Sequence, residues 1–354
     1  MKNTATGTET GASASTTMRS TAQREDWVDV AKGLGILLVV IGHVWNGTPK
    51  AFIYMFHMPL FFFLSGYLST VRNDKGKFLA DKSISLLIPY VAFVVLLGSR
   101  EIAKHAVAGR TDQFIWAFES TLLGGEVLQG WPGTAWFIVC LFFTQQLVNL
   151  LLSTFGMRRT TYVVLLLLAL SYAQTWLFPT FWLPLALNVV AGAAPFYFAG
   201  YLYKRVTSSV SIKAAAFIAM LLGVVLFSMH VPLRYDMKTA YFGIPILSFV
   251  VALGFIVTLF GLCKLMAQRP SLAAPFMRLG EASLVIMFVH APVYMVMIDK
   301  FHIKSVTLVV LVATGVSYVA YLTMRSTSLT RALFLGSRRD IQRLLEWRPG
   351  VQQA

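Results

Sequence analysis

Charged residues are scarce in this chain. They make up 13% of its 354 residues, whereas hydrophobic residues make up 57% and the mean hydropathy is +0.68. A soluble domain of this length needs many more polar side chains to hydrate its surface. The scarcity of charge therefore argues against a soluble globular protein and predicts an all-α, polytopic membrane protein.

Cysteine is nearly absent as well. The chain has two, Cys140 and Cys263, and each lies inside an apolar run that we expect at a different membrane depth. Two such residues do not approach to the distance that a disulfide requires. No histidine or cysteine grouping has the spacing of metal ligands, so we expect neither a disulfide nor a metal site.

Acidic residues are few. The chain has 15 of them against 30 lysines and arginines, which gives a net charge of +15. Such a charge is also typical of nucleic-acid-binding proteins, but here the basic residues lie mostly in short segments between apolar runs. Membrane topology explains this pattern better. We therefore expect membrane lipids around the chain and no nucleic acid as a partner.

An internal repeat is also lacking. No pair of interrupted helices recurs in two halves of the chain, as it does in many secondary transporters. This absence lowers the expectation of a transporter. A transporter or flippase with a proton path through its polar residues remains the main alternative function.

Ten apolar windows are long enough to span a bilayer as helices. They lie near residues 27–45, 52–69, 84–102, 135–152, 161–178, 184–203, 214–229, 243–263, 282–298 and 305–324. With the N-terminus in the cytoplasm, 21 lysines and arginines fall on the inner side and eight on the outer side. This asymmetry predicts that both termini are cytoplasmic.

The two ends of the chain differ from the membrane domain that we predict over residues 25–325. Residues 1–24 are rich in Ser, Thr, Gly and Ala and have no apolar core, so we expect a disordered cytoplasmic tail and no cleaved signal peptide. Residues 326–354 contain SRRDIQRLLEWR, which has the pattern of a short amphipathic helix on the inner leaflet.

The first window holds three ionisable residues, Asp29, Lys32 and His43. In a helix, the eleven residues from Lys32 to His43 turn the chain about 20° beyond three full turns and rise about 16 Å. Asp29 lies on the same face. Seen along the helix axis, it is about 40° from His43, on the side opposite to Lys32. One helix face thus joins a cation near the inner surface to an imidazole near the outer one. Ionisable groups at such depths usually serve chemistry or transport.

Three glycines of this window, Gly33, Gly35 and Gly42, allow another helix or a slender ligand to approach closely.

Two further histidines, His57 and His290, lie within apolar windows. A short turn joins the first two windows, so His57 is expected at the depth of His43 and close to it. An imidazole with a pKa of about 6.5 can take a proton from a hydroxyl and return it, as a general base must. The alternative is that each histidine only hydrogen-bonds a neighbouring helix.

Basic residues gather beside the inner end of the first window. Arg72 and Lys75 lie in the second inner loop, with two more lysines after them. Together with Lys32 they form a cluster suited to phosphates. The positive-inside bias alone also explains the cluster, and Asp29 is placed to neutralise Lys32.

The longest connection, about 103–134, is aromatic, Gly-rich and acidic towards its end. On the predicted topology it faces outward. Aromatic rings beside acidic residues suit a sugar, which offers apolar faces and many hydroxyls, and Trp136 is a candidate for contact with such a substrate. An interfacial belt explains Trp116, Trp131 and Trp136 equally well.

Five segments resemble, in order, the acyltransferase 3 family of membrane acyltransferases. They are DVAKGLGILLVVIGHV, FHMPLFFFLSGYL, LLIPY, AWFIVCLF and LGEASLVIMFVHAPV. They span about residues 27–293 and resemble most the fucose O-acetylase-like branch, which decorates bacterial exopolysaccharides. The family is marked by a basic residue, ten intervening residues and a histidine, here Lys32 and His43. Many members carry arginine instead of Lys32, and a lysine lacks its bidentate contact with phosphate.

The resemblance implies that an acetyl group passes from cytoplasmic acetyl-CoA to a glycan hydroxyl at the far side of the bacterial inner membrane. The glycan acceptor is either free or lipid-linked. Lys32, Arg72 and Lys75 then bind the phosphates of coenzyme A, and Asp29 orients Lys32.

Within this reaction we expect His43 and His57 to carry out the catalysis. His43 either deprotonates the acceptor hydroxyl or briefly carries the acetyl group. The sequence is compatible with both of these routes. His57 positions or polarises the reacting groups. Glu281 and His290 belong to the last matched segment and are expected in the inner and central parts of the tunnel. A membrane sensor whose histidines titrate without catalysis is a third possible function.

Overall fold

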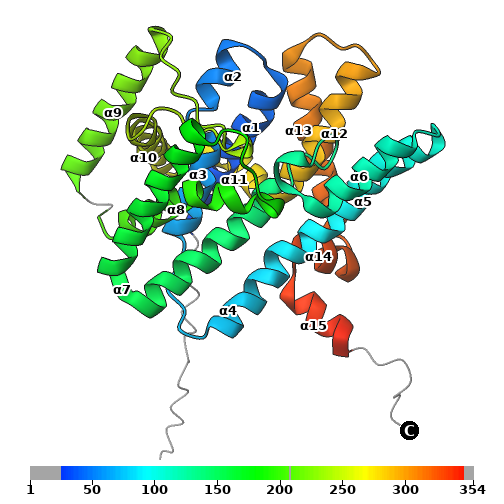
Figure 1. Cartoon of the computed structure of the whole chain (residues 1–354), viewed down its shortest axis with the longest axis horizontal. Helices are drawn as coiled ribbons and strands as arrows, with labels where there is room; N and C mark the ends of the chain where they lie inside the picture. The colour runs from blue at the N-terminus through cyan, green and yellow to red at the C-terminus, as the bar shows by residue number, and fades with distance from the viewer. Residues whose placement is uncertain (1–24, 207–208, 347–354) are drawn as a thin grey trace, which may run out of the picture.

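The computed structural model of the chain describes residues 25–206 and 209–346, and every regular element in these ranges is a helix. Seven helical segments are long and apolar enough to cross a membrane. They are α1 (Asp26–Val44), α4 (Lys75–Lys82) continued through a π-helical turn (Ser83–Leu87) into α5 (Ile88–Val107), α7 (Trp136–Leu177), a short 3-10 segment (Pro184–Val189) with α8 (Val190–Tyr203), α9 (Val210–Ser228), α10 (Leu247–Ala267) and α13 (Val306–Met324). An eighth candidate is the pair α11 (Pro270–Glu281) and α12 (Ser283–Asp299), which is bent by 75°. The predicted all-α membrane bundle is therefore confirmed (Figure 1).

Two of the ten predicted windows share one long helix. The 42-residue α7 covers both 135–152 and 161–178, and Gly156 interrupts it with φ of 70°. Glycine adopts such a conformation without steric cost, so the two windows are separated there by a kink and not by a loop.

The predicted window 52–69 is not one helix. It is divided between α2 (Thr48–Ile53) and α3 (His57–Tyr67). The physical reason is Pro59, whose ring would clash with the carbonyl of Met55 in any helix that continued from α2. The 11 residues of α3 rise only about 16 Å, roughly half of the hydrocarbon thickness. The number of spans therefore stays a prediction.

The remaining helices are short and lie outside these candidate spans. They are α6 (Thr111–Leu123), which forms a hairpin with α5, two 3-10 turns (Gly125–Val127 and Met237–Thr239), α14 (Ser328–Leu335) and α15 (Arg338–Glu346). The connection expected over about 103–134 is thus mostly helical. The predicted disordered tail, residues 1–24, lies outside the described residues.

The first helix is at the centre of the bundle. It packs against α2, α3, α10, α11, α12 and α13, and Val30, Ala31 and Ile36 are fully buried. A Cβ atom on Gly33 would collide with the Phe276 carbonyl of α11, and one on Gly280 of α11 would collide with the Asp29 carbonyl. The two backbones therefore touch, which confirms close helix packing as the use of Gly33.

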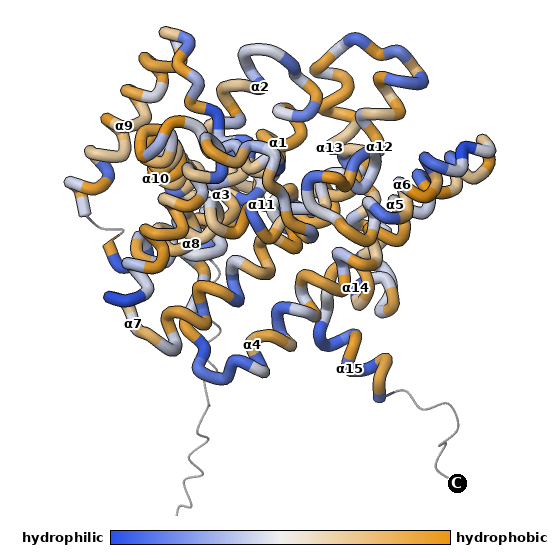
Figure 2. Tube along the Cα trace, viewed as in Figure 1, coloured by the Kyte–Doolittle hydropathy of each residue, from blue (hydrophilic) through white to orange (hydrophobic). Residues whose placement is uncertain are grey.

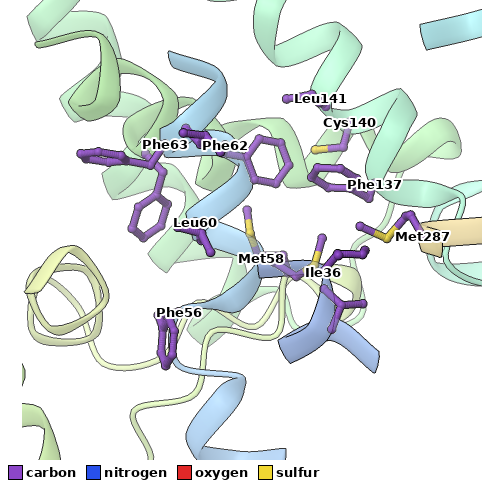
Figure 3. Close-up of a cluster of buried hydrophobic side chains, with 14 of the residues drawn as sticks. Ile36, Phe56, Met58, Leu60, Phe62, Phe63, Phe137, Cys140, Leu141 and Met287 are labelled. Atoms are coloured by element: carbon purple, nitrogen blue, oxygen red, sulfur yellow. The ribbon is translucent and has the colours of Figure 1, made fainter. Parts of the chain in front are cut away.

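A second pair of helices is joined in the same way. A Cβ atom on Gly66 of α3 would collide with the Tyr197 carbonyl of α8, and one on Gly200 of α8 would collide with the Phe63 carbonyl of α3. An apolar cluster of buried side chains includes Ile36 from α1, Phe62 and Phe63 from α3, and side chains of α7 and α12 (Figure 3).

The C-terminal helices are tied to the side of the molecule that carries α4. Arg331 donates two hydrogen bonds of 2.9 Å to Asp340, and these bonds hold the pKa of the Asp340 carboxyl well below its usual range. Arg338 forms an ion pair with Asp81 of α4. Hydrophilic residues are concentrated on α4, on α15 and in the connections at the opposite end of the bundle (Figure 2).

The contact between α1 and α11 predicts a strong effect of one methyl group. Gly33→Ala should lower the stability of the purified protein by at least about 2 kcal/mol, because a backbone carbonyl cannot yield as a side chain can. Thermal unfolding in detergent measures this loss as a lower Tm. Gly261→Ala in α10 is the matched control, since no atom lies within 4 Å of its added Cβ. Equal Tm values for the two variants would contradict the close contact.

Candidate functional site

Three adjacent cavities follow α1 from one side of the bundle to the other. We call the side of α4, α14 and α15 the inner side. The inner cavity has a volume of about 570 Å³, the middle cavity about 270 Å³ and the outer cavity about 160 Å³. The inner and middle cavities share Lys32, Ser283 and Leu284, and the middle and outer cavities share Met287. Lys32 and His43 therefore line one series of cavities, as their spacing on α1 predicts.

The inner cavity is lined by charges of both signs. Lys32 Nζ lies 3.2 Å from Asp29 Oδ1, and the Asp29 side chain is buried. Glu281 from the end of α11 and Arg325 from the end of α13 complete the charged lining. Because Lys32 is one-third exposed and borders two cavities, its pairing with Asp29 leaves the ammonium open to a ligand.

Arg325 was not among the residues predicted from the sequence. It follows directly after the last apolar window, at the end that the predicted topology places on the same side as Lys32. Two predicted partners of Lys32 lie elsewhere. The backbone of Arg72 is bonded to the side chain of Asn149, and Lys75 Nζ donates to Thr154 Oγ1 at 2.9 Å. Both contacts are to α7, and neither basic residue lines one of the three cavities.

The middle cavity is mainly apolar. Phe137, Leu141 and Met287 belong both to its lining and to the core drawn in Figure 3. Ser65 also lines it, and the Ser65 hydroxyl accepts a hydrogen bond of 2.8 Å from Gln145 Nε2. A cavity of this kind accommodates an uncharged, flexible chain better than a charged group.

The outer cavity brings His43 and His57 together. Both line it, and the Tyr54 ring lies near each of them, with ring-centroid distances of 6.5 Å from His43 and 4.6 Å from His57. His290 lies beside His43, with 5.2 Å between the ring centroids, and Tyr294 stacks on His43 at 6.1 Å. The structure thus gathers three histidines from three different helical segments.

Two of these histidines have a defined tautomer. His57 Nδ1 lies 3.0 Å from the Ile53 carbonyl, and His290 Nδ1 lies 2.7 Å from the Ile286 carbonyl. A carbonyl only accepts, so Nδ1 carries the proton and Nε2 keeps its lone pair in the neutral ring. His290 Nε2 is buried and has no hydrogen-bond partner among the described residues. Both rings therefore present an acceptor atom to their surroundings.

The outer wall of this cavity is a segment between α9 and α10 that the sequence did not point to. The Tyr235 amide donates to the Tyr54 carbonyl at 2.8 Å, and Asp236 and Lys238 line the cavity. Lys238 Nζ donates to the Leu128 carbonyl at 2.9 Å, which joins this segment to the loop before α7. Burial raises the pKa of Asp236 and lowers the pKa of Lys238, while their opposite charges act against both shifts.

The tryptophans expected near the outer surface have different surroundings. Trp136 is buried and lines the outer cavity beside the histidines. Trp131 instead stacks under the Arg100 guanidinium at 4.0 Å, and Trp116 is exposed. Of the three, only Trp136 is placed to touch a molecule in the described cavity.

Residues 25–325 match the sequence model of a known family, the acyltransferase domain of the acyltransferase 3 type. Two curated proteins are similar to the chain, and each is a nodulation protein NolL. The one from Mesorhizobium japonicum is 28% identical over 204 residues, which are 52% of this chain and 49% of that protein. The one from Sinorhizobium fredii is 28% identical over 146 residues, which are 33% of this chain and 40% of that protein. The chain thus spans half or less of the length of these relatives, and no solved structure matches it.

The cavity series predicts that its two ends open to opposite sides of the membrane. In a Cys140→Ala/Cys263→Ala background, Lys50→Cys in the outer cavity should react with a membrane-impermeant maleimide added to sealed right-side-out vesicles. Arg325→Cys in the inner cavity should react only after the vesicles are permeabilised. Labelling of both cysteines from one side would disprove this arrangement.

Proposed function

This chain belongs to the acyltransferase 3 family of membrane acyltransferases, and from that premise we propose that it transfers an acetyl group from cytoplasmic acetyl-CoA to a hydroxyl of an exported or cell-surface glycan. The proposed location is the bacterial inner membrane. One observation carries the proposal: three adjacent cavities run along α1 from Lys32 to His43. A donor held on the inner side thereby reaches an acceptor on the outer side, and neither molecule has to cross the membrane.

The inner and middle cavities fit the two parts of coenzyme A. Lys32 and Arg325 offer cations to its phosphates, and Asp29 keeps the Lys32 ammonium in place. The pantetheine arm is on the order of 15–20 Å long, comparable to the rise of about 16 Å from Lys32 to His43. Arg72 and Lys75 remain predicted contacts for the part of the nucleotide that projects beyond the inner cavity.

The chemistry is assigned to the outer cavity. His43 accepts the proton of the acceptor hydroxyl, whose oxygen forms the new ester bond with the acyl carbon while the bond from that carbon to sulfur breaks. The imidazolium of His43 then returns the proton to the departing thiolate. His57 and His290 present lone pairs at Nε2 that accept hydrogen bonds from the reacting hydroxyl or from protonated His43.

A second route has the same reactants and products. In it His43 attacks the thioester, carries the acetyl group and passes it to the acceptor. The two routes differ in kinetics, because an acyl-enzyme gives a ping-pong pattern and releases coenzyme A before the acceptor binds.

Removal of the His43 imidazole tests the catalytic assignment. His43→Ala should reduce transfer of label from radioactive acetyl-CoA to membrane polysaccharide by about 10²–10⁴-fold, while the protein keeps its Tm. The control is His302→Ala, since His302 is exposed and lines none of the three cavities. Substantial transfer by folded His43→Ala would exclude His43 as the base. A wild-type protein that leaves acetyl-CoA unconsumed but moves a substrate across the membrane would instead be a transporter.

Removal of the Lys32 charge tests the donor site. Lys32→Ala should raise the KM for acetyl-CoA about tenfold or more, because a charge-assisted contact with phosphate is lost, and should change kcat less. Lys32→Arg should retain or improve binding. Lys213→Ala, at an exposed lysine of α9, is the matched control. A changed preference for the glycan with an unchanged KM for acetyl-CoA would refute the phosphate assignment.

A further inference from the structure

We propose that Asp236 binds and orients the acceptor sugar, accepting a hydrogen bond from a second sugar hydroxyl while His43 engages the reacting one. This inference rests on the proposed function and adds to it the residue that recognises the acceptor. The chemical class of the acceptor is then a sugar with neighbouring free hydroxyls.

The backbone around Asp236 directs its side chain into the outer cavity. Tyr235 and Met237 on either side are buried in the core, and the Tyr235 amide is bonded to the Tyr54 carbonyl. The Tyr241 amide donates to the Asp236 carbonyl at 3.0 Å and closes the turn. Asp236 itself lines the cavity that contains His43 and His57. The carboxylate is therefore held at the reacting end of the cavity series and on its outer side.

The Asp236 carboxylate accepts a backbone hydrogen bond at Thr239 and has further lone pairs for a ligand. Lys50, Lys238 and Arg234 act on it through space, but none of the ion pairs found among residues 25–206 and 209–346 includes Asp236. Lys238 is engaged by the Leu128 carbonyl. A half-buried carboxylate without a close cation accepts hydrogen bonds readily, and sugar hydroxyls are suitable donors.

The other lining residues fit a single sugar ring. Trp136 and Tyr54 provide aromatic surfaces for its apolar faces, and Thr134 and Thr239 provide hydroxyl groups. The volume of about 160 Å³ corresponds to about five water molecules at their liquid volume, which is enough for roughly one pyranose ring. A carboxylate in this place also disfavours an acidic group on the sugar ring that enters.

Asp236→Asn is the central test because it keeps the size of the side chain and removes its charge. The acceptors are methyl glycosides of fucose, galactose and glucose, with polysaccharide extracted from membranes of expressing cells as a fourth. Asp236→Asn should raise the acceptor KM about tenfold or more. The KM for acetyl-CoA should change by less than about twofold, because the donor phosphates bind at the other end.

Two comparisons make the result specific. Asp299→Asn, at an exposed carboxylate of α12 outside the outer cavity, should leave both KM values unchanged. Slow hydrolysis of acetyl-CoA without acceptor should be equal in Asp236→Asn and wild type, whereas His43→Ala should lose it.

Two outcomes would overturn the inference, and they differ from failure of the proposed function. An unchanged acceptor KM in Asp236→Asn, or an equal rise of both KM values, would remove Asp236 from acceptor binding while the wild type still transfers label. A wild-type protein that transfers no label from acetyl-CoA to any of the four acceptors would remove the proposed function and this inference together.

Discussion

The contact between the backbones of α1 and α11 is the constraint on which the site depends. Gly33 follows Lys32 directly, and Gly280 precedes Glu281 directly, so the contact that these glycines permit brings the charged residues of both helices to one cavity. The bend of 75° between α11 and α12 then turns the chain along the outer half of α1 and places His290 beside His43. One packing interaction thereby positions both ends of the cavity series.

The break between α2 and α3 serves the outer end of the site. The helices stop on either side of Tyr54 and Phe56, and the Tyr54 ring lies near both His43 and His57. The Tyr54 carbonyl in turn holds the segment that carries Asp236. In an unbroken second helix, the Tyr54 carbonyl would accept a hydrogen bond from within that helix and would not hold this segment. The irregular backbone is tolerated because protein and a polar cavity surround it.

The polarity of the cavities changes along their length. Cations and carboxylates line the inner cavity, apolar side chains line the middle one, and imidazoles with hydroxyl and carboxylate groups line the outer one. Met287 lines both of the last two cavities, so a flexible side chain lies where they meet.

The sequence by itself determined the membrane bundle, most helix positions and the alignment of Lys32 with His43, because hydropathy and the 3.6-residue period are local properties. It also placed His57 in the same cavity as His43, since a short turn joins their helices. Only the tertiary structure decided that Arg325, and neither Arg72 nor Lys75, lines the cavity of Lys32, and that Asp236 closes the outer cavity. These residues lie far from α1 in the sequence, and a loop has no periodicity that predicts its neighbours. Contacts between distant segments follow from packing of the whole bundle, which no local pattern encodes.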